Sequence, residues 1–193
     1  MRDLIKMVVV LTVICGASGL VLSYSNKATK APREYQLLKY VQEPSIKAVL
    51  NSFDNDPIKD RIVVKIGKDE KGKPVEKNIF PAKKGDKVIG LAYSSAATGY
   101  HGPIDVMVGI DPTGKVTGIS IMTHTETPGL GARIVEPAFT KQFKGFTLSP
   151  ELNLSAKGGK IDGVSGATHS SEGVVEAVRK ALELFPRVKK EVG

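Results

Sequence analysis

The sequence predicts an α+β fold, an antiparallel sheet with packed helices, preceded by one N-terminal transmembrane helix. Three features predict it: an uncharged apolar run near the N-terminus, short β-branched segments separated by turn residues, and a final amphipathic helical pattern. Because the strands come first, are joined as hairpins and are followed by a helix, they favour an antiparallel sheet over a parallel βαβ array.

The uncharged run extends from Met7 to Asn26. As an α-helix with a rise of about 1.5 Å per residue, it would be about 30 Å long, which matches the hydrocarbon core of a bilayer. A retained membrane span is therefore the favoured interpretation. A cleaved signal peptide is an alternative, because Ala17, Ser18 and Gly19 offer a small-residue site, but the apolar run continues past them. A buried core helix is the third interpretation.

The chain divides into three predicted parts. Residues 1–26 are the anchor, residues 27–60 are a linker with an entry helix, and residues 61–193 are a globular domain. Pro44 interrupts the helical spacing of the entry segment. Basic residues flank the anchor on both sides, so the positive-inside rule gives no clear orientation.

Four segments of the domain have the β-branched composition and the turn boundaries of strands. They are residues 61–66, 88–97, 104–110 and 115–123. The turn Asp111–Gly114 joins the last two segments, and its proline and glycine fit a type I turn. We therefore expect these two segments to form a hairpin.

A lysine-rich segment, residues 59–87, contributes to the formal net charge of +8. A solvated surface explains it most simply. Contact with anionic lipid or with an acidic partner is the alternative, and both interpretations stay open.

The chain ends in a predicted amphipathic helix. Ser170 or Ser171 would cap it, Glu172 would favour its positive end, and Pro186 would stop it. The apolar residues with helical spacing are Val174, Val175, Val178, Ala181, Leu182 and Phe185.

Composition excludes several classes of function. Cys15 is the only cysteine, so the chain has no disulfide framework, no CxxC redox pair and no iron–sulfur cluster of its own. Only three histidines accompany it, which argues against a four-ligand zinc site. Tryptophan is absent and aromatic residues make up 6% of the chain, which argues against a stacking platform for nucleic acid.

The segment 162–171, DGVSGATHSS, places a tight turn of small residues directly before the final helix. Such a turn can point successive N–H groups at an anion, and the helix dipole adds a favourable potential. The expected ligand is a phosphate near the hydroxyl of Thr168, which is either a hydrogen-bond donor or a point of covalent attachment. A helix N-cap after a glycine turn is the simpler alternative.

The segment 124–133, HTETPGLGAR, is the second candidate site. Glycines flank Leu130, so the backbone can approach a ligand closely. His124 and Glu126 would share one face of a strand. A metal pair, an acid–base pair and a polar loop without chemistry all fit these residue types.

A third motif, TGYHG at 98–102, holds Tyr100, which would either pack against a flat ring or cover the sheet. Taken in order, TGYHG, VGIDPTGKVTGISI, HTETPGLG and DGVSGAT resemble the FMN-binding domain of two respiratory proteins. These are the G subunit of the Rnf electron-transport complex and the C subunit of the sodium-translocating NADH:quinone reductase. The resemblance covers nearly the whole chain, and its length and the full HTETPGLG motif favour the Rnf protein.

The resemblance implies a covalent cofactor, FMN, joined through its phosphate to Thr168 at the end of the SGAT motif. A separate flavin transferase would form this phosphoester from FAD. The other cofactor-binding residues that the resemblance implies are Ser165, Gly166, Ala167, His124, Glu126, Thr127, Gly129, Leu130 and Tyr100.

The resemblance also implies a function, the relay of electrons within a membrane complex that couples ferredoxin and NAD redox chemistry to Na⁺ or H⁺ translocation. Sites for nicotinamide and ferredoxin would belong to partner subunits, since the chain has neither GxGxxG nor a cysteine cluster. The domain would lie on the extracytoplasmic side of the cell membrane, with lipid around the anchor and no nucleic acid partner. A stand-alone flavoprotein reductase for an external acceptor and a non-redox FMN sensor are the alternatives.

Overall fold

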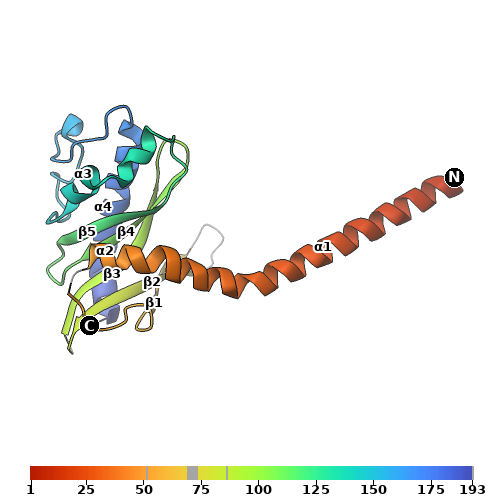
Figure 1. The fold of residues 1–193 in the computed structure, drawn as a ribbon, viewed down its shortest axis with the longest axis horizontal. Coiled ribbons are helices and arrows are strands. Elements are labelled where there is room, and N and C mark those ends of the chain that lie inside the picture. Colours follow the sequence, from red (N-terminus) through yellow and green to blue (C-terminus); the bar gives the residue numbers. More distant parts are fainter. Residues whose placement is uncertain (51, 69–73, 86, 193) are drawn as a thin grey trace. The chain divides into compact units, whose positions relative to one another are not determined.

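The computed structural model of the chain describes residues 1–50, 52–68, 74–85 and 87–192. The chain forms two compact units, Met1–Tyr40 and Val41–Gly193. The first unit is helical, and the second is a sheet with helices on both of its faces (Figure 1).

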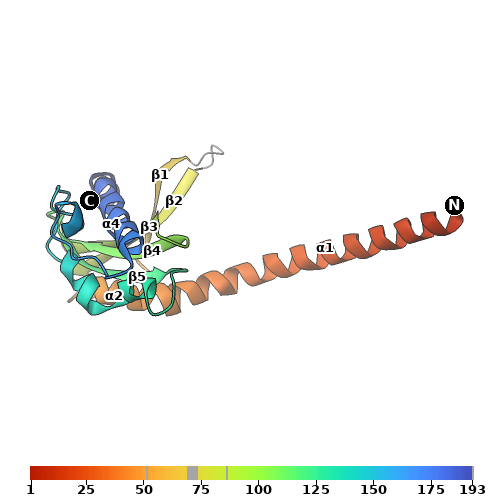
Figure 2. The same ribbon diagram turned by 90° about the horizontal axis from the view of Figure 1, so that it is seen from above.

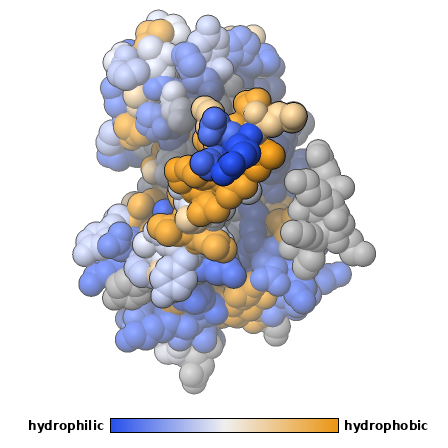
Figure 3. All heavy atoms as spheres, turned by 90° about the vertical axis from the view of Figure 1, so that its right-hand side faces the viewer, coloured by the Kyte–Doolittle hydropathy of each residue, from blue (hydrophilic) through white to orange (hydrophobic). Residues whose placement is uncertain are grey.

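The first unit consists mainly of the helix α1, Arg2–Leu37. Among the described residues, α1 is the one helix long and apolar enough to cross a membrane, over the stretch Arg2–Lys30. All large hydrophobic side chains of this stretch are exposed, and Figure 3 shows them around the helix. The predicted N-terminal apolar helix is therefore confirmed.

The second unit is built on a five-stranded sheet in which neighbouring strands are antiparallel and follow chain order. This confirms the predicted α+β fold with an antiparallel sheet. The strands are β1 (Ile62–Lys68), β2 (Pro74–Lys84), β3 (Lys87–Thr98), β4 (Pro103–Ile110) and β5 (Val116–Thr123).

The strand β2 is the one that the sequence pattern did not single out, because its first half is polar and it contains Pro81. It pairs with β1 on one side and β3 on the other, and it buries Ile79, Phe80 and Ala82. Pairing and burial therefore outweigh its weak intrinsic preference for a strand.

The helix α4, Thr168–Val192, covers one face of the sheet (Figure 2). All the apolar residues predicted for this helix are buried, in one core cluster with the side chains of β3 and β4. Inside this core, the hydroxyl of Tyr93 on β3 donates a hydrogen bond to the carbonyl oxygen of Ala181 at 2.8 Å. The predicted amphipathic helix thus supplies one side of the core.

Two details of the predicted helix are wrong. The helix α4 does not stop at Pro186 but continues to Val192. Proline removes one intrahelical hydrogen bond, but Phe185 and Val188, on either side of it, are buried in the core and hold the last turns. The helix also begins before the two serines that were expected to cap it, so both serines lie in its first turn.

The opposite face of the sheet carries the short helix α2, Glu43–Val49, which follows the π-helical turn Leu38–Gln42. Pro44 stands in the first turn of α2, where a missing N–H costs no hydrogen bond. Pro44 therefore lies in the first turn of this helix, whereas the sequence pattern indicated an interruption.

Three glycines on neighbouring strands, Gly90, Gly109 and Gly118, form a floor beneath the end of α2. A Cβ atom on Gly109 would lie 2.5 Å from the carbonyl oxygen of Val49, and one on Gly118 would lie 3.3 Å from the Cα of Val49. A Cβ atom on Gly90 would lie 2.9 Å from a methyl group of Leu50. The backbone of α2 can approach the sheet this closely only because the glycine floor carries no side chains.

Replacing Gly109 with alanine is therefore expected to push α2 away from the sheet. Overpacking of this kind costs about 1–3 kcal/mol of the free energy of unfolding. The matched control is Gly67→Ala on β1, where a Cβ atom would meet nothing within 4 Å. Urea unfolding should give a lower midpoint for Gly109→Ala than for Gly67→Ala, and equal midpoints would contradict the close contact.

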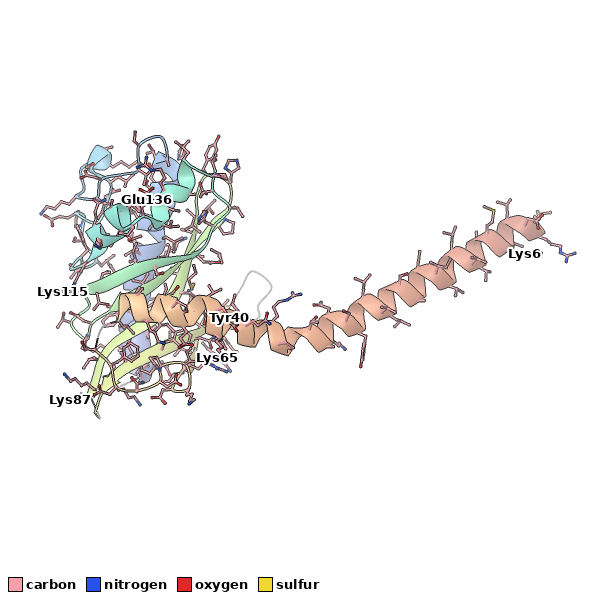
Figure 4. The ribbon with its side chains drawn as sticks, in the orientation of Figure 1. Lys6, Tyr40, Lys65, Lys87, Lys115 and Glu136 are labelled. Carbon is pink, nitrogen blue, oxygen red and sulfur yellow. The ribbon has the colours of Figure 1, made fainter. Side chains whose placement is uncertain are left out.

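The segment between β5 and α4 adds short helices and further core residues. Phe139 and Phe143 are buried and pack edge to face, with ring centroids 5.3 Å apart. In Figure 4, Glu136 marks the end of the domain that carries this segment, and Lys87 marks the other end of the sheet. The short helices are η2 (Gly131–Val135), α3 (Pro137–Thr140), η3 (Lys141–Phe143) and η4 (Ser155–Lys157).

Candidate functional site: a cavity at the start of α4

The turn that precedes α4 is built from small residues and is tied to the helix. Gly166 has a φ of 76°, in the left-handed region that favours glycine. The hydroxyl of Ser171 accepts a hydrogen bond from the N–H of Val164 at 3.0 Å and donates one to the carbonyl oxygen of Ala167 at 2.9 Å. These bonds hold the turn in place directly before Thr168.

The turn between β3 and β4 lies against the first turns of α4. Within this turn, the N–H of Gly99 donates to the carbonyl oxygen of Gly102 at 2.7 Å. A Cβ atom on Gly173 of α4 would lie 2.9 Å from the carbonyl oxygen of Thr98 and 3.0 Å from the Cα of Gly99. A glycine in the helix thus brings the TGYHG motif next to the SGAT motif.

Glu126 connects these two motifs through a buried carboxylate, and the residue is only 4% exposed. Its Oε1 accepts hydrogen bonds from the N–H groups of Tyr100, at 2.9 Å, and His101, at 3.1 Å. Its Oε2 accepts a hydrogen bond from the hydroxyl of Ser170. Burial by itself raises the pKa of Glu126, but the bonds from Ser170, His101 and Tyr100 favour the charged form and lower the pKa below its ordinary value.

We expect Glu126 to stabilise the fold in a pH-dependent way. Because its pKa is lower in the folded than in the unfolded chain, its contribution is fully present above the ordinary carboxyl pKa and is lost as the pH falls through the folded-state pKa. The difference in free energy of unfolding between wild type and Glu126→Gln should therefore shrink on acidification from neutral pH. Urea unfolding over a pH series measures it, and a constant difference would contradict the assignment.

A cavity of about 430 Å³ lies among these segments. It brings together residues from the three motifs that the sequence singled out. The predicted site residues in its lining are Tyr100, Glu126, Thr127, Leu130, Gly166, Ala167 and Thr168.

Three other predicted site residues are not part of this lining. Ser165 is exposed in the turn before Gly166. Gly129 has a φ of 73°. The Nδ1 of His124 accepts a hydrogen bond from the N–H of Glu126 at 3.3 Å. For these three residues, as for the seven in the lining, contact with a cofactor stays a prediction.

The lining also contains three residues that sequence reasoning missed, namely Gly131, His169 and Ser170. A Cβ atom on Gly131 would lie 3.0 Å from the hydroxyl oxygen of Ser170, so a larger residue would crowd the site. The ring of His169 is nearly parallel to that of Tyr100, with an angle of 12° and 6.2 Å between the centroids. The sequence signals were that Gly131 is the second glycine beside Leu130 and that His169 and Ser170 directly follow the SGAT motif.

The described residues contain no group of three or more His, Cys, Asp or Glu side chains that could hold a metal ion. In that part of the chain, His124 and Glu126 therefore have no third partner for the metal pair considered from the sequence. The site offers backbone N–H groups at a helix start, hydroxyl groups and exposed apolar side chains at its rim. These groups suit an anionic organic ligand.

Comparison with known proteins identifies the family. The model of the FMN-binding domain family matches residues 99–183, which include the whole cavity lining. The G subunit of the ion-translocating oxidoreductase complex of Methanosarcina acetivorans is 30% identical over 185 residues, which cover 94% of each chain. This chain belongs to the family of G subunits of ion-translocating oxidoreductase complexes. The resemblance inferred from the motifs is thereby confirmed.

Another relative in this family comes from Clostridium ljungdahlii, where it is named as the G subunit of a proton-translocating ferredoxin:NAD⁺ oxidoreductase complex. It is 30% identical over 178 residues, which cover 90% of this chain and 86% of the relative. The fold is similar to that of the C subunit of the Na⁺-translocating NADH-quinone reductase from Parabacteroides distasonis. That likeness has a TM-score of 0.56 at 20% identity and covers 81% of this chain and 96% of the other.

Proposed function

We propose that this chain is a membrane-anchored flavoprotein electron carrier, with FMN joined through its phosphate to Thr168. It is a redox subunit of an Rnf-type complex that couples ferredoxin and NAD oxidoreduction to the translocation of Na⁺ or H⁺. Within this complex the chain relays electrons, and the sites for ferredoxin and NAD lie on partner subunits.

The position of Thr168 carries this proposal. Thr168 is the first residue of α4, follows the left-handed Gly166 and lines a cavity of a size common for cofactor sites. The first N–H groups of an α-helix have no partner within the helix, and the helix dipole is positive at this end. A phosphate is therefore favoured beside the hydroxyl that would esterify it.

The remaining residues of the cavity fit the organic part of FMN. Tyr100 and Leu130 are 66% and 45% exposed, and covering them would remove apolar surface from water. We assign both to packing against the flavin ring. When bound, FMN supplies the one-electron chemistry, and the protein holds and tunes it. The other proposed FMN-binding residues are Ser165, Gly166, Ala167, His124, Glu126, Thr127 and Gly129.

The proposal places the carrier at the cell membrane. Membrane anchoring is supported by the exposed apolar surface of α1 and by relatives from ion-translocating complexes. The FMN domain is on the extracytoplasmic side, where a flavin transferase attaches FMN from FAD. The partners are the other subunits of the complex, and lipid surrounds α1.

Mass spectrometry of a single peptide tests the proposal. Trypsin cleaves after Lys160 and Arg179 and releases the peptide 161–179, which contains Thr168. In protein purified from its native membrane, we expect this peptide to carry the mass of FMN less one water, placed on Thr168 by fragmentation. An unmodified peptide from a colourless sample would overturn the proposal. Flavin fluorescence that no longer migrates with the protein band in a gel after SDS denaturation would favour a reversible FMN sensor instead.

A further inference from the structure

Both oxygens of the Glu126 carboxylate accept hydrogen bonds from protein donors, and the resemblance also placed this residue against the flavin. Tyr100 and His101 donate backbone N–H groups to Oε1, and Ser170 donates its hydroxyl to Oε2. The donors come from two different segments, the turn between β3 and β4 and the first turn of α4. Glu126 itself belongs to a third segment, after β5.

Two glycines enclose the same carboxylate. A Cβ atom on Gly99 would lie 2.5 Å from Oε1, and a Cβ atom on Gly131 would lie 3.0 Å from both Oε2 and the Cβ of Glu126. Larger residues at either position would displace the carboxyl group. Both positions therefore keep space for the carboxylate between the two segments that donate to it.

We propose that Glu126 is a positioning residue that holds the TGYHG turn against the start of α4, so that Tyr100 and Thr168 line one cavity. Only the identity of the ligand in that cavity rests on the proposed function. Removing the carboxylate leaves two backbone N–H groups and one hydroxyl without the acceptor that ties them together. The turn then separates from the helix, and Tyr100 no longer keeps its position relative to Thr168.

The first test needs no flavin. In full-length protein carrying Thr168→Ala, hydrogen exchange of the Tyr100 and His101 amides reports directly on the bonds to Glu126. Adding Glu126→Ala should raise their exchange rates by about tenfold, as expected for the loss of a buried acceptor. Glu126→Gln keeps a carbonyl oxygen as acceptor and should restore most of the protection. Exchange rates unchanged by Glu126→Ala would overturn the proposal.

The second test uses protein with Thr168 intact and measures flavin occupancy by intact mass and by visible spectrum. Glu126→Ala should lower occupancy or shift the spectrum, and Glu126→Gln should rescue both. The control is Tyr93→Phe, which removes the buried hydrogen bond to Ala181 away from the cavity. If Tyr93→Phe lowers occupancy as much as Glu126→Ala does, the effect is general destabilisation and the proposal fails.

Three further outcomes keep the tests decisive. If Glu126→Ala does not fold, Ser170→Ala removes only one of the three bonds and should give a smaller rise in exchange at Tyr100, whereas no rise would overturn the proposal. If wild-type protein carries no flavin, the proposed function fails, but the exchange experiment still decides the role of Glu126. If wild type carries flavin and Glu126→Ala matches it in exchange and occupancy, only the positioning role fails.

Discussion

Replacing Thr168 with alanine is expected to abolish covalent flavin completely, because the substitution removes the oxygen atom that would form the phosphoester. The domain should still fold, since Thr168 is exposed and the bonds of Ser171 that hold the preceding turn are untouched. Flavin fluorescence in a gel after SDS denaturation measures the loss, and circular dichroism checks the fold.

The matched control for this substitution is Thr168→Ser, which keeps a hydroxyl at the same place on the helix. It should retain flavin, in an amount set by how well the transferase accepts serine. A flavin adduct in the intact mass of Thr168→Ala protein would refute the attachment site. Equal loss of flavin in both variants would show that the hydroxyl is not sufficient.

The second large effect is expected for Gly166→Ala. Alanine in the left-handed region costs about 1–2 kcal/mol, and its Cβ atom would lie 2.9 Å from a methyl group of Leu130. To relieve the backbone strain, the turn before α4 would have to change its conformation. To relieve the close contact, the side chain of Leu130 in the cavity lining would have to move. We therefore expect a lower free energy of unfolding and a several-fold loss of flavin occupancy.

A neighbouring glycine provides the control for this prediction. At Gly163, three residues earlier in the same turn, a Cβ atom would lie 3.6 Å from a methyl group of Leu154, which is an ordinary contact. Gly163→Ala should therefore retain both stability and flavin. Denaturant unfolding and intact mass measure the two properties, and equal behaviour of the two variants would argue against a special role for the backbone at Gly166.

Periodicity predicted the fold where burial follows a simple pattern. The buried residues Val174, Val178 and Leu182 of α4 recur every four positions, so the helix and its core face could be inferred directly. The end of the helix could not be inferred from the sequence. The burial of Phe185 and Val188, in one core cluster with residues of distant strands, outweighs the cost of Pro186 between them. Tertiary packing also explains why the polar strand β2 was not singled out.

The site was predictable to the extent that its residues lie in short motifs. The hydroxyl of Thr168 and the turn before it follow from local sequence, and the structure places them at one cavity with Tyr100 and Leu130. The hydrogen bonds of Glu126 were not predictable, because its donors are 25 to 44 residues away along the chain. Sequence spacing alone does not indicate which backbone N–H groups a carboxylate will meet.

The glycine floor beneath α2 has a practical consequence for where the soluble part of the protein should be cut. A fragment that begins at Val41 keeps α2, whereas one that begins at residue 61 uncovers bare backbone on β3, β4 and β5. The cut also removes Ile46, Val49 and Leu50, which are buried, so the face of the sheet that α2 covers becomes exposed. The shorter fragment should therefore be aggregation-prone, although it retains every strand and the whole of α4.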